Sequence, residues 1–219
     1  MNSPRLSFRL GFTAATLLGL LAAGCSTPAH QQAAQTSGTL TNAADDIETA
    51  RRNLNSATIA LDRLLNQPAT DLRPAFTDYR GAVDSLDRSM ARVHDRAQEM
   101  ADRRQSYIAT WDRENAAITD PAVRARSVAR QQEVANQLLQ AERSYLDVRE
   151  DMTPLLAGLR DVQRLLSVDL TPAGVENARS LFGQVERNAE RTRRSLDRLA
   201  QDFREASVHV NPSTTVIAE

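Results

Sequence analysis

The chain has 219 residues, and its 27 basic and 28 acidic side chains leave a net charge of −1 at pH 7. This balance excludes the basic surface on which nucleic-acid binding depends. Every basic residue is arginine, so no lysine is available to form a Schiff base with a carbonyl substrate. Only 4% of the residues are aromatic and only 8 are glycine, a composition typical of long helices rather than of sheets.

The first 24 residues have the pattern of a secretory signal peptide. Arg5 and Arg9 form a basic start, an uncharged run of 15 residues follows, and this run ends in small residues before Cys25. Such a run is shorter than the roughly 20 residues that a membrane-spanning helix requires. We therefore expect residues 1–24 to be removed by cleavage between Gly24 and Cys25.

Cys25 is the only cysteine, so it has no disulfide partner within the chain. Its setting resembles the signal of bacterial lipoproteins, in which this cysteine carries a lipid as a thioether and becomes the first residue of the mature protein. The resemblance implies a membrane anchor of acyl chains on Cys25, and more than one chain is needed for stable anchoring. Ser26 follows in place of an aspartate. By analogy with enteric lipoproteins, this implies the outer membrane, facing the periplasm.

The segment after the cysteine changes character at residue 40. Residues 25–39 are small and polar and lack an apolar rhythm, so they are predicted to form the lipidated N-terminus and a flexible tether. From residue 40 to Leu64, apolar residues recur at steps of three and four, and Gln67-Pro68 then interrupts the pattern. This spacing predicts a first helix over residues 40–66.

The same spacing predicts a second, longer helix over residues 71–118. Two residues, Arg104 and Glu114, interrupt its apolar stripe. A long arginine side chain can pass along an apolar surface to reach water, so Arg104 is compatible with the stripe. At 1.5 Å per residue, a helix of this length measures about 70 Å.

A third helix is predicted over residues 121–168. Asp120 is its expected N-cap, because aspartate accepts hydrogen bonds from the first free N–H groups, and Pro121 suits the first helical position. Pro154 lies inside the range. The apolar pattern keeps its phase across this proline, so we expect a kink there rather than a helix end.

A fourth helix is predicted over residues 172–206, with Thr171 as N-cap and Pro172 at the first position. The tail at 207–219 is expected to be frayed, and a short strand at 208–210 is a second interpretation of its start.

The expected fold is all-α. All four apolar stripes have heptad spacing, which is typical of helices that wind around one another. Short connections place consecutive helices antiparallel, so residues 40–206 are predicted to form an elongated antiparallel four-helix coiled-coil bundle. Helices 2 and 3 are longer than their neighbours. They are therefore expected to project as a two-stranded hairpin tip around the turn near residue 119.

Residues that carry chemistry are sparse. The three histidines, His30, His94 and His209, are far apart, and none lies three or four residues from another, so we expect no metal site. There is no strand-bound nucleophile elbow and no glycine-rich phosphate loop, and Cys25 is no nucleophile once it is acylated. We expect no catalytic residue, no cofactor and no enzymatic activity.

The expected hairpin tip contains the candidate residues for a partner contact, since aromatic and arginine side chains are frequent anchors of protein interfaces. These candidates are Tyr107, Trp111, Arg113, Arg124 and Arg126. A second interpretation is that the two aromatics fill the core of the hairpin, because both occupy positions of the apolar stripe. Both interpretations stay open at the level of sequence.

Six short segments resemble a bacterial helical lipoprotein family of unknown function, catalogued as domain-of-unknown-function family twenty-nine fifty-nine. They are DLRPAF (71–76), YIATWD (107–112), DPAVRARS (120–127), MTPLL (152–156), LRDVQ (159–163) and DLTP (169–172). The likeness covers roughly residues 45–205. It implies a coiled-coil periplasmic domain and supplies no activity, ligand or catalytic residue.

The leading functional hypothesis is a non-enzymatic, lipid-anchored periplasmic protein that acts as an envelope spacer or docks an unidentified envelope protein. A chaperone-like bundle that binds a small ligand or peptide is an alternative, because alanine-rich stripes form thin cores. Regulation of a peptidoglycan hydrolase is another. We expect no nucleic-acid partner. A homo-oligomer stays open, since a domain-swapped dimer uses the same heptad pattern.

Overall fold

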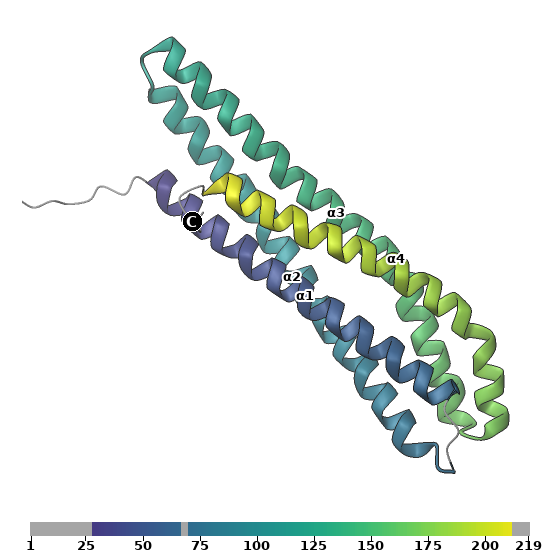
Figure 1. Cartoon of the computed structure of the whole chain (residues 1–219). Coiled ribbons are helices and arrows are strands. Elements are labelled where there is room, and N and C mark those ends of the chain that lie inside the picture. Colours follow the sequence, from purple (N-terminus) through teal and green to yellow (C-terminus); the bar gives the residue numbers. More distant parts are fainter. Residues whose placement is uncertain (1–27, 67–69, 212–219) are drawn as a thin grey trace, which may run out of the picture.

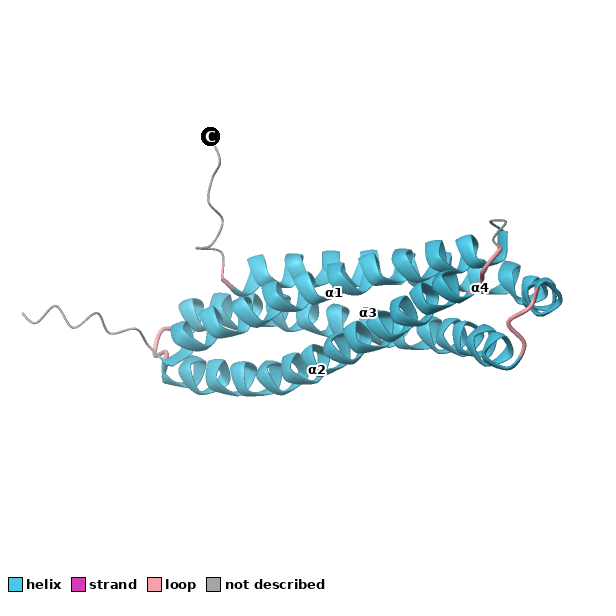
Figure 2. Ribbon diagram, turned by 90° about the horizontal axis from the view of Figure 1, so that it is seen from below, coloured by secondary structure: helices cyan, strands magenta, loops and turns pink. Residues whose placement is uncertain are grey.

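The computed structural model describes residues 28–66 and 70–211, which form four long α-helices and contain no strand. The helices are α1 (Pro28–Asn66), α2 (Arg73–Ala117), α3 (Pro121–Val168) and α4 (Pro172–Val210). They make one elongated bundle (Figures 1 and 2). The predicted all-α bundle is therefore confirmed. The signal peptide, Gly24 and Cys25 lie outside the described residues.

The four helices are arranged as a ring of neighbours. α1 packs along α2 and α4, α3 packs along α4, and the contact between α2 and α3 is the least extensive of the four. Consecutive helices are antiparallel, because the turns between them are short (Figure 1). At one end α2 and α3 continue past the start of α1 and the end of α4 (Figure 1). This is the projecting hairpin that the helix lengths predicted.

The core follows the predicted apolar stripes. In α1, every third or fourth residue from Leu40 to Leu64 is at most 1% exposed. Leucine and isoleucine alternate there with alanine, so α1 lies close to its neighbours and buries one narrow face. Complete burial of such side chains stabilises the bundle by about 1.5–3 kcal/mol for each leucine or isoleucine.

The predicted tether is wrong from Pro28 onward, because α1 begins there and not at residue 40. The positions that continue the stripe toward the N-terminus include Thr36 and Ser37, which are 3% and 4% exposed. The hydroxyl of Ser37 lies 2.9 Å from the hydroxyl of Ser207 in α4. A hydroxyl can be buried at low cost when it is hydrogen-bonded, so a polar segment here folds as helix.

The end of α4 also differs from the prediction. The helix continues to Val210, so the alternative of a short strand at 208–210 is wrong. Ser207 and Val210 are both buried, at 8% and 5% exposure, and the hydroxyl of Ser207 contacts that of Ser37 near the start of α1. Only Asn211 of the remaining tail is described.

The turns have local causes that are visible in the side chains. The carboxylate of Asp120 accepts hydrogen bonds from the N–H groups of Ala122 and Val123, at 2.8 and 3.0 Å, and so caps α3. The hydroxyl of Thr171 accepts from the N–H of Gly174 at 3.2 Å and caps α4. A Cβ at Gly174 would lie 2.0 Å from a backbone oxygen of the α3–α4 turn, so this turn requires glycine. α3 continues through Pro154 without a break.

Candidate functional site

The hairpin tip consists of residues 108–131, where α2 and α3 extend beyond the four-helix body. Two contacts mark the boundary. Arg130 donates a hydrogen bond to the carbonyl oxygen of His209, near the end of α4, at 2.7 Å. Gln32, near the start of α1, lines the same shallow surface pocket as Ser106 and Tyr107 of α2. Past this level α2 and α3 have only each other to pack against (Figure 1).

The buried side chains of the tip are polar. Within residues 108–131 three side chains are buried, and they are Thr110, Asn115 and Gln131. Two helices alone cover too little surface to enclose a wide apolar stripe, and a buried polar side chain is tolerated when its hydrogen bonds are made inside the protein. The tip therefore depends on hydrogen bonds where the body depends on apolar packing.

Asn115 and Gln131 form the centre of a hydrogen-bonded network between α2 and α3. The side-chain amide of Asn115 donates to the side-chain oxygen of Gln131 at 2.9 Å, and the Gln131 amide donates to the carboxylate of Asp112 at 2.6 Å. The hydroxyl of Ser127 donates to the side-chain oxygen of Asn115 at 2.5 Å. These bonds fix which residues of α2 face which residues of α3.

The two predicted aromatics lie at the base of this network. Tyr107 is 6% exposed and Trp111 is half-buried, with ring centroids 5.6 Å apart. The indole N–H of Trp111 donates to the Ser127 hydroxyl at 3.1 Å, and burial raises the pKa of the Tyr107 hydroxyl. Both rings therefore pack within the hairpin, which favours core filling over a partner contact for these two residues.

The three predicted arginines have different surroundings. Arg113 donates to the hydroxyl of Thr110 at 2.9 Å, and Arg124 donates to the carbonyl oxygen of Ile118 at 2.9 Å. Arg126 is exposed. Arg113 and Arg124 thus support the hairpin and its turn, although all three side chains remain accessible on the tip.

The sequence pattern missed the polar centre of the tip. It placed Glu114 in the stripe, but Glu114 is exposed and Asn115 is buried, since the stripe advances by four residues from Trp111 rather than by three. It also left Arg104 to reach water, whereas Arg104 forms an ion pair across the α2–α3 contact with Glu142 at 3.2 Å. One signal in the sequence could have located this centre: Asn115 and Gln131 lie opposite each other in an antiparallel hairpin. A search for apolar residues alone overlooks such an amide pair.

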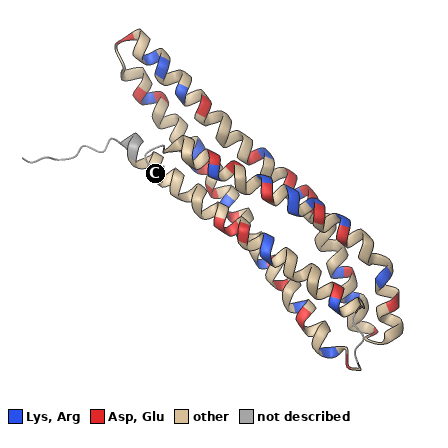
Figure 3. Cartoon of the chain, in the orientation of Figure 1, with Lys and Arg blue, Asp and Glu red and all other residues tan. Residues whose placement is uncertain are grey.

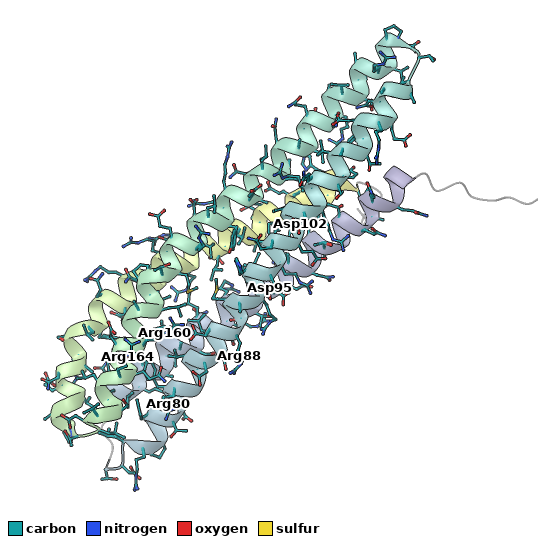
Figure 4. The ribbon with its side chains drawn as sticks, turned by 180° about the vertical axis from the view of Figure 1, so that it is seen from behind. Arg80, Arg88, Asp95, Asp102, Arg160 and Arg164 are labelled. Carbon is teal, nitrogen blue, oxygen red and sulfur yellow. The ribbon has the colours of Figure 1, made fainter. Side chains whose placement is uncertain are left out.

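A second region of interest is a groove between α2 and α3 near the opposite end of the bundle. Its lining consists of Arg80, Asp84, Asp87, Arg160, Gln163, Arg164 and Ser167. Figure 4 labels three of these arginines there, together with Arg88, while Asp95 and Asp102 lie nearer to the tip. One amino group of Arg160 contacts both carboxylate oxygens of Asp87 at 2.9 Å. Arg80 lies over the ring of Phe76, 5.9 Å from its centroid.

Elsewhere the charges are interleaved. Acidic and basic residues alternate along the helices on the face in Figure 3.

Across the described ranges, 28–66 and 70–211, no three histidine, cysteine, aspartate or glutamate side chains come close enough to hold a metal ion. None of the four described helices has the length and apolar character needed to cross a membrane.

These features define an antiparallel four-helix bundle with a projecting two-helix hairpin. The chain belongs to the family described as Protein of unknown function (DUF2959), whose profile matches residues 37–211. This is the family that the sequence segments resemble. The match begins within the first turns of α1 and ends at the residue after α4, so it covers the bundle with its hairpin. No curated protein matches the chain.

Proposed function

We propose that this protein is a non-enzymatic, lipid-anchored spacer of the bacterial cell envelope, held by acyl chains on Cys25 at the periplasmic face of the outer membrane. The observation that carries the proposal is the start of α1 at Pro28, three residues after the cysteine. Only two residues, Ser26 and Thr27, separate Cys25 from this helix. The position of the bundle relative to the membrane is therefore restricted.

The first turns of α1 are held firmly in the bundle. Ala33, Thr36 and Leu40 are buried, and the hydroxyl of Thr41 lies 3.1 Å from that of Ser207. A force on Cys25 therefore acts on a packed helix and not on a loose tether. This coupling supports a role as a spacer, which must hold two structures at a fixed distance.

The length of the bundle supports the same role. α3 has 48 residues, which at 1.5 Å per residue gives about 70 Å. If the protein stands upright, the α1–α2 and α3–α4 turns lie at this distance from the membrane.

Two measurements test the proposal. Mass spectrometry of the purified protein should find acyl chains on an N-terminal Cys25, and Cys25→Ser should release the protein from the membrane fraction. The variant Cys25→Ser/Val128→Cys is the matched control: it keeps one thiol in the chain but should also be released. On a supported bilayer, the acylated protein should form a layer about 70 Å thick, whereas about 25 Å would show a bundle lying flat and overturn the spacer role.

The groove near the far end favours a second function, the docking of an acidic protein segment. Three arginines line it against two aspartates, and Asp87 is already engaged by Arg160. An acidic segment would therefore meet Arg80 with little competing negative charge from Asp87, and at Arg164 it would compete with the exposed carboxylate of Asp161, 3.3 Å from that guanidinium group. Arginine suits this role because its planar guanidinium binds carboxylates with two hydrogen bonds.

Binding of a polyglutamate peptide tests the docking function. Arg80→Ala/Arg164→Ala should weaken binding by about two- to thirtyfold at low salt, since each exposed ion pair contributes about 0.2–1 kcal/mol. Arg187→Ala, which removes an exposed arginine of α4 that contacts Gln184, should leave binding unchanged. Equal losses in both variants would contradict a specific groove.

A further inference from the structure

The hairpin tip lies at the same end of the bundle as the start of α1 (Figure 1). Gln32 of α1 and Tyr107 of α2 line one pocket and so lie at one level. From this level α1 extends four residues to Pro28, about 6 Å, and α2 extends ten residues to Ala117, about 15 Å. The turn of the hairpin therefore ends about 10 Å beyond the first residue of α1.

Cys25 can reach the same level as this turn. It precedes Pro28 by three residues, which span at most about 10 Å when extended. If Cys25 carries the acyl chains, as proposed above, the plane of the membrane surface passes close to the end of the hairpin. A hairpin that points away from the membrane would require the long flexible tether that the structure replaces with helix.

The surface of the turn is suited to contact with lipid. Residues 116–123 read AAITDPAV, in which six of the eight residues are apolar. Ile118 is half-buried, and Val123 is 43% exposed. The carboxylate of Asp120 is bonded to two backbone N–H groups of α3, so it already has partners within the protein. In the hydrated headgroup region, the carbonyl groups at the end of α2 that lack helical partners can accept hydrogen bonds from water.

Charge around the turn favours a lipid headgroup region of either net charge. Arg113, Arg124 and Arg126 are exposed, and Asp112, Glu114 and Asp120 balance them. The arginines can donate to lipid phosphates, as guanidinium groups do with phosphate in general. With Arg130 included, the tip has four arginines and three acids and a net charge of +1, so its binding depends only weakly on anionic lipids.

We propose that the turn of the hairpin, residues 116–123, inserts into the headgroup region of the membrane that holds Cys25. The protein then contacts the bilayer at two points, the acyl chains and the turn. The apolar surface of the turn is small, so its affinity alone is weak. The anchor raises its effective concentration at the membrane, as a linker does for a second binding site. The second contact restricts the tilt of the bundle further than the acyl anchor alone.

The single tryptophan of the chain allows a direct test. Trp111→Phe/Val123→Trp moves it to the turn, and Trp111→Phe/Val168→Trp moves it to the far end, where Val168 is 90% exposed. Both proteins begin at Cys25 and, apart from these substitutions, keep the sequence of the described residues. Cys25 is coupled to a maleimide lipid in vesicles of phosphatidylethanolamine and phosphatidylglycerol with brominated acyl chains, so anchoring does not depend on natural acylation.

Tryptophan at position 123 should be quenched about twofold or more, since an interfacial residue lies about 5–10 Å into the headgroup and acyl boundary. Tryptophan at 168 should keep its emission. Adding Ala122→Asp to the turn variant should remove the quenching without releasing the protein from the vesicles. Equal quenching at both ends, or none at position 123, overturns the proposal. Absence of acyl chains on the natural protein would instead overturn the anchor.

A photo-crosslinking residue at position 118 in cells separates lipid from protein contacts at the turn. Adducts with phospholipid support the proposal. Adducts with one protein in place of lipid would overturn it and assign the tip to a protein partner.

Discussion

The four-helix body and the hairpin tip are built from the same two helices, yet their interiors differ. In the body, α2 and α3 bury Val83, Leu86, Val148 and Leu155 against α1 and α4. In the tip, the same helices bury Thr110, Asn115 and Gln131. Apolar burial stabilises a helix in proportion to the area that neighbours cover. Beyond the ends of α1 and α4, hydrogen bonds between α2 and α3 stabilise the hairpin in place of apolar packing.

The difference also concerns specificity. An apolar stripe tolerates a shift of one helix along the other, whereas a buried amide pair is satisfied in one alignment only, as buried asparagine is in coiled coils. The network around Asn115 therefore sets the register of the hairpin and the position of its turn. The body contributes stability, and the tip contributes alignment.

The largest expected effect is in the body. Leu54 of α1 is 0% exposed, so Leu54→Ala should lower the free energy of unfolding by about 2–5 kcal/mol. Val123→Ala in the tip should change it by no more than about 0.5 kcal/mol. Urea denaturation measures both. Similar losses would show that the tip is packed as tightly as the body.

The next effect concerns the polar centre of the tip. Gln131→Leu deprives the Asn115 amide of its acceptor and should cost about 1–3 kcal/mol. Asn115→Leu/Gln131→Leu should recover most of this loss, because a well-packed apolar pair can replace a buried polar one. Thermal unfolding and hydrogen exchange of the tip amides measure the change. If the double variant is less stable than Gln131→Leu alone, apolar packing at this site cannot replace the hydrogen bonds.

A smaller effect is expected from Tyr79, whose hydroxyl donates to the carbonyl oxygen of Leu159 at 2.6 Å. Tyr79→Phe should cost about 1 kcal/mol at neutral pH. Burial raises the pKa of Tyr79, so the folded state keeps the neutral hydroxyl while the unfolded state ionises near pH 10. The contribution of Tyr79 to the free energy of unfolding should therefore be constant below about pH 10 and fall above it.

Chemical denaturation at a series of alkaline pH values tests this assignment. Tyr79→Phe should reduce the loss more than Tyr107→Phe, because Tyr79 is 0% exposed and Tyr107, at the base of the tip, is 6% exposed. If the free energy of unfolding falls equally steeply with pH in the two variants, the tyrosines of body and tip do not differ in this respect.

The smallest effect is expected at Glu48 of α1, which accepts hydrogen bonds from Arg204 at 2.9 Å and Arg51 at 2.8 Å. These guanidinium groups lower the pKa of Glu48. The contribution of Glu48 to the free energy of unfolding is present above the pKa of glutamate in the unfolded state, about 4.3, and is lost as the pH falls below that value. Glu48→Gln should cost about 0.5 kcal/mol at neutral pH and flatten the acid loss.

A matched control for Glu48 lies beside the tip. Glu133, which pairs with Arg130, is 64% exposed in its side chain, so Glu133→Gln should change the free energy of unfolding by less than about 0.3 kcal/mol. A larger effect there than at Glu48 would show that ion pairs, and not apolar packing, distinguish the two regions.

Much of the fold could be predicted because its signals are local. The stripe of α1 from Leu40 to Leu64 and the capping residues Asp120 and Thr171 act within one or two helical turns, so they are visible in the sequence. The first turns of α1 were missed because Thr36 and Ser37 are polar. The hydroxyl of Ser37 finds its partner in Ser207, which lies 170 residues away in the sequence.

The candidate site was predicted only in part. The tip was located from helix lengths, but its buried residues were not, because Asn115 and Gln131 are compatible with burial only when each supplies the other's hydrogen bond. Of the predicted contact residues, Tyr107 and Trp111 pack inside the hairpin. The far groove gave no sequence signal, since Arg80 and Arg160 lie 80 residues apart.

The sequence by itself determined the helical class, the start of α3 and α4, and the projection of the hairpin, because periodicity and capping are properties of neighbouring residues. It also supplied the expectation of an acylated Cys25. Only the tertiary structure decided that α1 begins at Pro28, that the tip has a polar interior, and that the tip lies at the same end of the bundle as the start of α1. These features depend on contacts between side chains of different helices, which local sequence patterns do not indicate.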